Sequence, residues 1–237
     1  MAEHVNSVVL PGDILTELSE TGKRSKLRLG PGLRLDAENV VVCKCGILRQ
    51  KEENVYWVDT HQKRYVPVKG ENVLGIITTK AGDIFKVDVG TNEQATLSYL
   101  AFEGATKKNR PNVQIGDLVY AKFLVANKDM EPELVCIDSA GRSNGLGVIS
   151  GGGFVFQCPL GLVRKILSPD CQLLKLLGKH MPFEIAVGLN GRVWVKARTI
   201  DHTIAICNAI SSVEFMTENQ IKIMVNQLVS VVGWSSR

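Results

Sequence analysis

The stretch FEIAVGLNGRVWVK, residues 183–196, decides the fold of the last third of the chain. Two runs rich in β-branched and aromatic residues flank an Asn-Gly pair, which is the strongest short-range signal for a β-hairpin. We therefore predict that Gly188, Leu189, Asn190 and Gly191 form a strand–strand turn. Its glycines are expected to permit positive φ and close packing against a neighbouring domain. Trp194 is expected to pack against that neighbour or against helices.

The residues before the hairpin predict one strand and two helices. The triple glycine at 151–153 precedes a short apolar strand at 154–156, and helical spacing of apolar residues begins after Pro159. Ser168, Pro169 and Asp170 interrupt this helix. Asp170 is expected to cap a second helix that runs to Gly178.

The residues after the hairpin predict two more helices. The first is expected to carry Ile200, Ile204 and Cys207 on one stripe. The sequence Thr-Glu-Asn-Gln at 217–220 has the form of a capping box and predicts the start of the last helix. The resulting order, β-α-α-β-β-α plus one helix, is that of the KH domain, an RNA-binding module.

The first two thirds of the chain predict β-structure. Short β-branched runs alternate with glycine-rich and proline-containing turns at residues 40–42, 55–58, 73–77, 84–89 and 117–123. A block of about 80 residues suits a five-stranded OB barrel. The predicted fold class is therefore mostly β with an α+β C-terminal part. Its predicted domains are an N-terminal β-domain (1–68), an OB barrel (69–149) and a KH-like domain (150–237).

The composition narrows the class of protein. The 237 residues are 45% hydrophobic and 22% charged, and no apolar run reaches the length of a membrane helix. The first residues do not resemble a secretion signal. The six cysteines are expected to be reduced and mostly buried, with Cys43 and Cys45 on one face of a strand. The net charge of +4 is too small to predict nucleic-acid binding by itself.

A long stretch of the sequence closely resembles a known family. The segments TLSYLAFEGATKKNRP (96–111) and IGDLVYA (115–121), together with the Gly-Leu-Asn-Gly turn, resemble the exosome component 3 family. These proteins are S-one/KH-type cap subunits of the eukaryotic RNA exosome. The resemblance covers nearly the whole chain and implies an N-terminal β-domain, an S-one-type barrel and a KH domain.

The resemblance implies a non-catalytic role without a cofactor. The expected partners are the RNase-PH-like ring subunits, the other cap subunits and single-stranded RNA, with no membrane. The expected function is to brace the ring and guide RNA into its pore for 3′–5′ processing and decay, in ribosomal RNA maturation and mRNA turnover. The implied locations are nucleus, nucleolus and cytoplasm. The alternative is a stand-alone OB/KH RNA-binding regulator, and a third reading is a phosphodiesterase with an unrecognised site.

Six residues are candidate RNA contacts. Lys107, Lys108 and Arg110 form the densest cationic run, in a loop between barrel strands that could instead be solvated or contact a partner subunit. Phe85 and Tyr99 could stack on bases, although ordinary core packing is the alternative. Arg142 is a possible contact in the glycine-rich turn at 141–147.

Several motifs are missing from the sequence. A KH domain normally grips RNA with a G-x-x-G loop between its first two helices, but here that loop reads Leu-Ser-Pro-Asp-Cys, and Asp170 would repel a phosphate. No catalytic residues are predicted, and the carboxylates of Asp83 and Asp88 are expected to be solvated. No metal site is predicted, because the four histidines show no ligand spacing beside the close cysteine pair.

Overall fold

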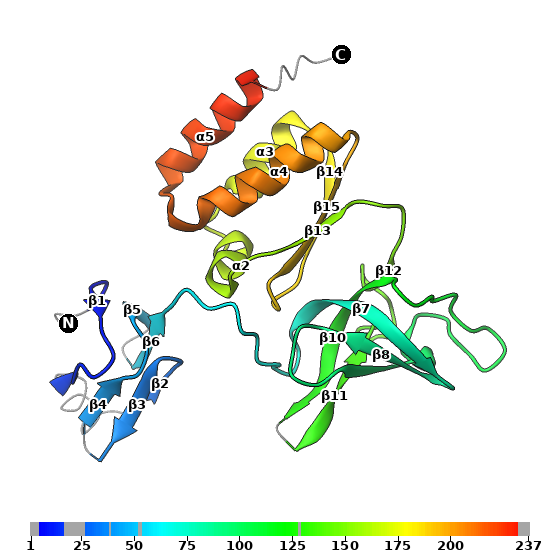
Figure 1. Ribbon diagram of the computed structural model, residues 1–237, viewed down its shortest axis with the longest axis horizontal. Coiled ribbons are helices and arrows are strands. Elements are labelled where there is room, and N and C mark those ends of the chain that lie inside the picture. Colours follow the sequence, from blue (N-terminus) through cyan, green and yellow to red (C-terminus); the bar gives the residue numbers. More distant parts are fainter. Residues whose placement is uncertain (1–4, 17–26, 38, 52–53, 128, 232–237) are drawn as a thin grey trace. The chain divides into compact units, whose positions relative to one another are not determined.

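The computed structural model describes residues 5–16, 27–37, 39–51, 54–127 and 129–231 (Figure 1). The chain divides into two compact units, residues 1–62 and residues 63–237. The first unit is a small β-structure, and the second joins a β-barrel to a KH-like domain. The predicted fold class, mostly β with an α+β C-terminal part, is confirmed.

The first unit contains a four-stranded sheet and a separate hairpin. The sheet has the order β1-β5-β6-β2, with β1 at Val8–Val9, β5 at Gly46–Lys51, β6 at Val55–Asp59 and β2 at Arg28–Leu29. The hairpin pairs β3 (Leu33–Asp36) with β4 (Asn39–Val42). Inward-facing residues such as Val40, Leu48 and Tyr56 form the core of this first unit. Alternate residues of β6 are buried, as a half-buried strand requires.

The cysteines of this unit differ from the prediction. Cys43 and Cys45 follow the end of β4 instead of lying in a strand, and both are exposed.

The other four cysteines, Cys136, Cys158, Cys171 and Cys207, are buried as free thiols. Burial raises the pKa of the Cys136 thiol to about 12, so this group stays protonated at neutral pH.

The barrel closes because its last strand pairs on both sides. Its strands are β7 (Asn72–Ala81), β8 (Ile84–Asp88), β9 (Ala95–Ser98), β10 (Leu118–Asn127) and β11 (Met130–Val135). Strand β11 pairs parallel with β9 and antiparallel with β10, while β10 also pairs with β7. Strand β12 (Gly147–Ile149) adds to the outer edge of β10. The short helix η1 (Tyr99–Ala101) follows β9.

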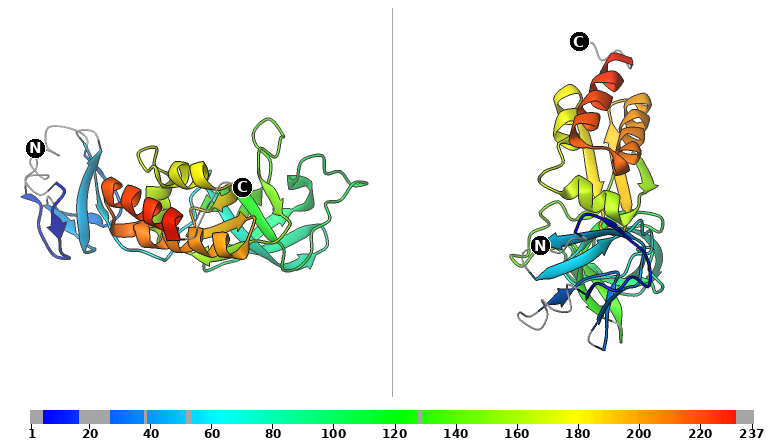
Figure 2. Two further views of the ribbon diagram at one scale, coloured as in Figure 1. Left: turned by 90° about the horizontal axis from the view of Figure 1, so that it is seen from above. Right: turned by 90° about the vertical axis from the view of Figure 1, so that its left-hand side faces the viewer.

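The KH-like domain places its helices against a three-stranded antiparallel sheet of order β13-β15-β14. The strands are β13 (Phe154–Gln157), β14 (Phe183–Val187) and β15 (Arg192–Ala197). The helices are α2 (Leu160–Leu167), α3 (Leu173–His180), α4 (Ile200–Ser212) and α5 (Glu218–Val231), with a turn η2 (Val213–Phe215) between the last two. Figure 2 shows α4 in orange and α5 in red running side by side. This order agrees with the predicted β-α-α-β-β-α plus one helix.

Two details of the predicted helices are wrong. Helix α3 begins at Leu173, and Gln172 precedes it without a capping hydrogen bond from its side chain, so Asp170 is no cap. The carboxylate of Asp170 instead lies 3.5 Å from the hydroxyl of Ser168 in the preceding turn. On α4 the buried face runs through Ile206 and Ile210, and the predicted stripe leaves Ile200 and Ile204 exposed.

None of the described helices is both long and apolar enough to cross a membrane. Among the described residues, no group of three or more histidine, cysteine or acidic side chains is placed to hold a metal ion.

Candidate functional site

The loop between η1 and β10 presents two lysines to solvent. Lys107 and Lys108 are exposed, and no ion pair between described residues includes either of them. The loop is a defined turn, since the N–H of Thr106 donates to the carbonyl of Asn109 at 3.0 Å and the N–H of Asn109 donates to the Thr106 hydroxyl at 3.0 Å. The two ammonium groups are therefore available to an anionic partner.

Arg110, at the end of the same run, already has two partners. Its guanidinium lies 2.9 Å from the carboxylate of Asp83 and 4.7 Å from the ring centroid of Tyr99. The ion pair is exposed at both ends and so stabilises the fold by no more than about 1 kcal/mol. Asp83 is 62% exposed, as expected, but its pairing with Arg110 was not predicted. Of the three predicted cations, Arg110 is thus the least available to a phosphate.

The two predicted stacking residues are buried. Phe85 is 8% exposed and Tyr99 is 5% exposed, and both belong to the barrel core. The Phe85 ring packs edge-on against Phe102, with 6.4 Å between the ring centroids. A base needs an open ring face for stacking. This placement favours the core-packing alternative for both rings.

Arg142 lies in an exposed turn next to the basic loop. The carboxylate of Asp138 shapes this turn by accepting from the Arg142 N–H at 2.9 Å. The N–H of Ser143 donates to the carboxylate of Glu103 at 2.9 Å, which ties the turn to the start of the loop that carries the lysines. Hydrogen bonding to Ser143 lowers the pKa of Glu103, so that this carboxylate remains charged. Glu103 carries no local signal in the sequence, because its partner lies 40 positions away.

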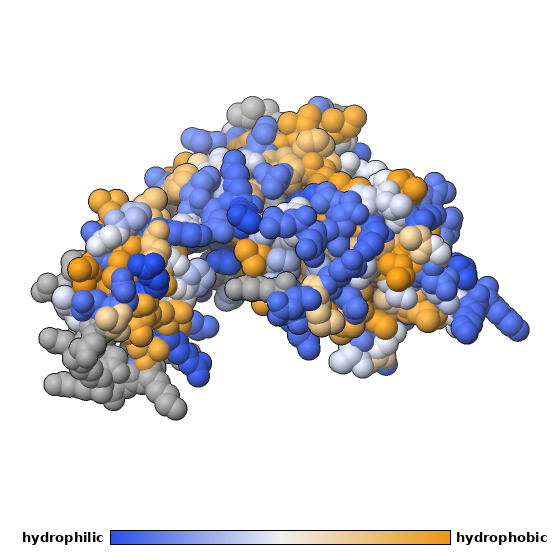
Figure 3. Space-filling model, turned by 60° about the horizontal axis from the view of Figure 1, so that its bottom comes forward, coloured by the Kyte–Doolittle hydropathy of each residue, from blue (hydrophilic) through white to orange (hydrophobic). Residues whose placement is uncertain are grey.

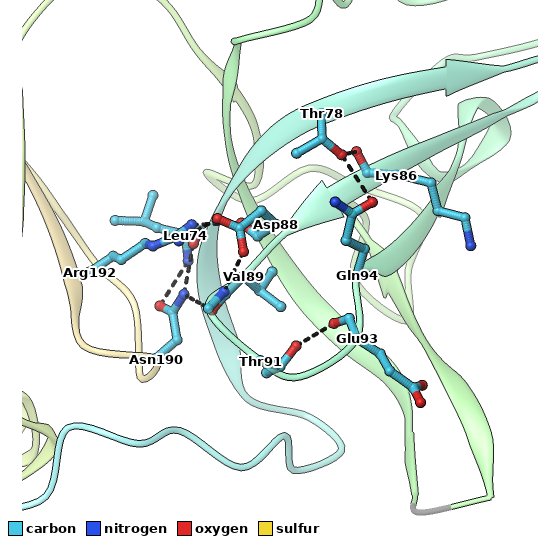
Figure 4. Close-up of polar contacts among 11 residues, drawn as sticks. Leu74, Thr78, Lys86, Asp88, Val89, Thr91, Glu93, Gln94, Asn190 and Arg192 are labelled. Atoms are coloured by element: carbon cyan, nitrogen blue, oxygen red, sulfur yellow. Dashed lines mark hydrogen bonds and ion pairs between the residues drawn. The ribbon is translucent and has the colours of Figure 1, made fainter.

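The turn at 188–191 inserts one side chain into the barrel wall (Figure 4). Asn190 is 3% exposed, and its Nδ2 donates to the carbonyl of Leu74 at 2.8 Å and to that of Val89 at 2.9 Å. Its Oδ1 accepts from the Leu74 N–H at 3.3 Å. The amide thus replaces solvent for three barrel backbone groups, and its own donor and acceptor are satisfied although it is buried.

Both glycines of the turn are required by close packing. A Cβ on Gly188 would lie 2.7 Å from the Leu74 nitrogen and would also clash with the Asn190 side chain. A Cβ on Gly191 would lie 2.6 Å from the Cys158 carbonyl, and only Gly191 has a positive φ, of +85°. Of the two glycines, therefore, only Gly191 needs the left-handed conformation.

An ion pair closes the junction beside the turn. Arg192 donates to the Asp88 carboxylate at 2.7 Å and to the Asp88 carbonyl at 2.6 Å. Burial alone would raise the pKa of Asp88, but the hydrogen bonds from Arg192 and from the Gly90 N–H, with the charge of Arg192, lower it overall. Asp88 keeps 41% of its side chain exposed, as expected for a solvated carboxylate, but its pairing with Arg192 was not predicted. No local pattern in the sequence indicated this pair, because its members lie 104 positions apart.

Tyr120 adds a further contact between the barrel and the KH-like domain. Its hydroxyl donates to the Val187 carbonyl at 3.3 Å, and the N–H of Leu189 donates to the Asn72 carbonyl at 2.9 Å. With Asn190 and Arg192, these bonds join the two domains at the end of the β14–β15 hairpin. The barrel and the KH-like domain are thus linked through both side-chain and backbone hydrogen bonds.

Trp194 is buried by the glycine segment at 151–153, which was not among its predicted partners. The indole is 6% exposed, and its Nε1–H donates to the Gly152 carbonyl at 3.1 Å. A Cβ on Gly153 would lie 2.5 Å from this nitrogen. The triple glycine therefore passes over the indole, and at Gly153 there is no room for even a Cβ.

The loop between α2 and α3 is compatible with the expected loss of the KH phosphate clamp. Residues 168–170 form an exposed turn in which Asp170 faces Ser168. No glycine is available to bring the backbone close to a phosphate. An RNA contact is therefore better supported on the barrel loops than here.

Three family models match the chain in sequence order. A model for the S1 domain of exosome complex component RRP40 matches residues 65–147, and a KH-domain model matches residues 153–201. A model for the N-terminal part of mammalian exosome complex component RRP40 matches residues 7–61.

Curated relatives carry the same description. The chain is 58% identical over 211 residues to exosome complex component RRP40 of Bos taurus, which covers 86% of this chain and 77% of that protein. It is 48% identical to the Drosophila melanogaster protein (88% and 90% covered) and 34% identical to that of Saccharomyces cerevisiae (87% and 88% covered). A solved structure assigned as an exosome complex RNA-binding protein has a TM-score of 0.57 at 24% identity, covering 70% of this chain and 96% of the other. That likeness supports the fold.

Proposed function

The chain belongs to the exosome complex component RRP40 family, and from this premise we propose that it is a non-catalytic RNA-binding cap subunit of the RNA exosome. In this role it braces the ring of RNase-PH-like subunits beside the other cap subunits. It also guides single-stranded RNA toward the pore for processing and decay. The complex acts in nucleus and cytoplasm, and we extend this proposal to the nucleolus.

The hydrogen-bonded junction at Asn190 is the observation that carries this proposal. A cap must transmit the position of its barrel to the complex, and flexibly tethered modules cannot do so. Asn190, Arg192 and Tyr120 fix the barrel to the KH-like domain through backbone and side-chain bonds. The same bonds support a division of function in which the KH-like domain is structural and the barrel loops meet RNA. The domain limits 1–68, 69–149 and 150–237 remain part of the proposal.

We assign the RNA contact to the exposed cations of two neighbouring barrel loops. Lys107 and Lys108 are free of ion pairs with described residues, and Arg142 lies on the turn that Glu103 ties to their loop. Three cations on connected loops can follow a phosphate backbone without reading its sequence. Arg110 contributes less, since Asp83 partly neutralises it. Phe85 and Tyr99 support the loops from the core.

Purification from cell extract tests the cap assignment. Native mass spectrometry of the tagged full chain should recover a stoichiometric complex with RNase-PH-like subunits. Recovery as a free monomer that still binds RNA would favour the stand-alone regulator instead. For the enzymatic alternative, the purified chain with Mg²⁺ or Mn²⁺ should leave labelled RNA intact, and cleavage that follows the protein through purification would overturn the assignment.

A further inference from the structure

A groove of about 640 Å³ lies between the start of β13 and the first turns of α4. Phe154 lines it from the strand, Ile200 and Ile204 line it from the helix, and Lys196 and Arg198 line it from the end of β15. It lies apart from the turn at 188–191 and from the loop between α2 and α3. Neither the junction nor the proposed RNA contact uses it.

The apolar side chains of the groove are unusually open to solvent. Phe154 is 56% exposed, Ile200 is 78% exposed and Ile204 is 53% exposed. Helix α4 buries Ile206, Ala209 and Ile210 against its own domain, so the stripe at 200 and 204 is a second apolar face of the same helix. Hydrophobic residues appear in orange among hydrophilic ones on the face drawn in Figure 3. A cluster of large apolar side chains at the surface is typical of an interaction site.

The charge around the groove has one sign. Lys196 and Arg198 lie at its edge, and none of the described residues that line it is acidic. The nearest carboxylates along the chain and across the sheet are those of Asp201, in the first turn of α4, and Glu184, which pairs with Lys196 in strand register. No ion pair between described residues joins either of them to Lys196 or Arg198. A partner with carboxylates beside its apolar residues would complement this edge.

The strand that borders the groove has a free edge. In the sheet order β13-β15-β14, β13 pairs only with β15 among the described strands. An edge strand presents unpaired N–H and C=O groups, which a second extended chain can bind. The groove thus offers backbone hydrogen bonds beside a pocket for side chains.

We propose that this groove is a docking site for an extended segment of a partner protein that combines apolar and acidic residues. The segment adds to the edge of β13, inserts an apolar side chain between Phe154 and Ile204, and places a carboxylate on Arg198 or Lys196. This inference goes beyond the proposed cap function and does not depend on it. Single-stranded RNA is the less suitable occupant, because the two isoleucines offer neither stacking planes nor hydrogen bonds to bases.

Selection from a displayed library of random 12-residue peptides on the purified full chain tests this proposal. We expect the selected peptides to be rich in apolar and acidic residues. Their affinity, measured by fluorescence polarisation, should fall at least about tenfold for Ile204→Lys and for Ile200→Lys. Arg198→Glu should select peptides with basic residues instead of acidic ones. Bound peptide should slow hydrogen exchange in residues 154–157.

Matched controls distinguish peptide binding in the groove from nonspecific binding to other exposed apolar or charged residues. Ile223→Lys replaces an isoleucine on α5 that is 57% exposed, and Arg164→Glu reverses an exposed charge on α2. Both should bind the selected peptides as the unchanged chain does, and all five variants should keep the melting temperature. No enrichment, enrichment without acidic residues, or equal binding to Ile204→Lys would overturn the proposal. If Ile204→Lys and Arg198→Glu instead weaken the binding of a labelled 20-nucleotide oligouridylate, the groove binds RNA and the proposal is wrong.

Discussion

Leu74 and Asn190 lie 116 positions apart and exchange two hydrogen bonds, from the Leu74 N–H to Asn190 Oδ1 at 3.3 Å and from Asn190 Nδ2 to the Leu74 carbonyl at 2.8 Å. A side-chain amide thereby occupies the place of a strand partner on β7. Because the same Nδ2 also binds the carbonyl of Val89, one residue of the KH-like domain bridges both ends of the β7–β8 hairpin.

Asn190→Asp is expected to destabilise the chain although the two side chains have the same shape. The replacement keeps an acceptor for the Leu74 N–H but removes the donor to two carbonyls and brings a carboxylate against them. Buried groups without partners cost about 1–3 kcal/mol each, so the free energy of unfolding should fall by about 2–5 kcal/mol. Urea denaturation of the full chain measures this difference.

Asn112→Asp is the matched control, because Asn112 is exposed in the loop before β10. Its effect should stay within about 0.5 kcal/mol. If Asn190→Asp is equally mild, the amide does not hold the junction.

The ion pair between Arg192 and Asp88 should make stability depend on pH. The pKa of Asp88 is lower in the folded chain than its ordinary value of 3.8. The pair therefore contributes fully above that ordinary value, and its contribution is lost as the pH falls from there through the lowered pKa of the folded state. Asp88→Asn should remove this part of the pH dependence and destabilise the chain at neutral pH.

Thermal unfolding from pH 2.5 to pH 7 measures the contribution of this pair. Asp36→Asn is the control, because Asp36 pairs with Arg34 at 3.3 Å where both side chains are about two-thirds exposed. That variant should follow the unchanged chain across the range. A parallel curve for Asp88→Asn would show that Arg192 does not stabilise the charged carboxylate.

Local signals predicted the elements well and their junctions less well. The Asn-Gly pair predicts the hairpin because a two-residue turn determines its own geometry, and the capping box at 217–220 agrees with the hydrogen bond from the Thr217 N–H to Gln220 Oε1 at 2.8 Å. The partners of Asp88 and Trp194 depend on segments 104 and 42 positions away. No periodicity encodes such distances.

The candidate site shows the same contrast between features that local sequence predicts and features that depend on tertiary packing. The position of the lysines in an exposed loop followed from the charge run and Pro111, whereas the burial of Phe85 and Tyr99 depends on how the barrel closes. The apolar stripe on α4 was predicted from helical spacing, but Ile200 and Ile204 on it are exposed. Helical spacing cannot distinguish an apolar face that packs in the core from one that faces solvent. Ile200 and Cys207 share the stripe, yet only Cys207 is buried.

Gly153→Ala should destabilise the chain more than Gly152→Ala. Both positions have positive φ, +108° and +81°, so both substitutions strain the backbone. Only at Gly153 would the new Cβ also meet the Trp194 ring, 2.5 Å from Nε1, while nothing lies within 4 Å at Gly152. The difference in melting temperature between the two variants isolates the contact with the indole.

Trp194→Arg should destabilise the chain by several kcal/mol, about 3–5, because it removes a large aromatic contact and buries a charge under the glycine segment. Trp57→Arg, at a half-buried tryptophan of β6, tests whether any tryptophan behaves in this way and should cost less. An unchanged melting temperature for Trp194→Arg would show that the packing of residues 151–153 on the indole does not stabilise the fold.

Lys107 and Lys108 should account for much of the salt dependence of RNA binding. Each phosphate contact on a single strand contributes about 0.7 to the slope of log affinity against log salt. Replacing both lysines with alanine should therefore flatten the slope by about 1.4 in the assembled complex, with a melting temperature unchanged because the side chains are exposed. Electrophoretic or anisotropy titrations of a labelled single strand at several salt concentrations give the slope.

Arg110→Ala provides the comparison that makes this result specific. Since Asp83 and the Tyr99 ring hold Arg110, its loss should change the slope less than the loss of one lysine, while lowering the melting temperature slightly. If the double lysine variant keeps both affinity and slope, the loop does not touch RNA. Loss of assembly in that variant would instead place its charges against a neighbouring subunit. The two outcomes separate because RNA affinity depends on salt through released counterions, whereas a subunit contact would appear in the composition of the complex.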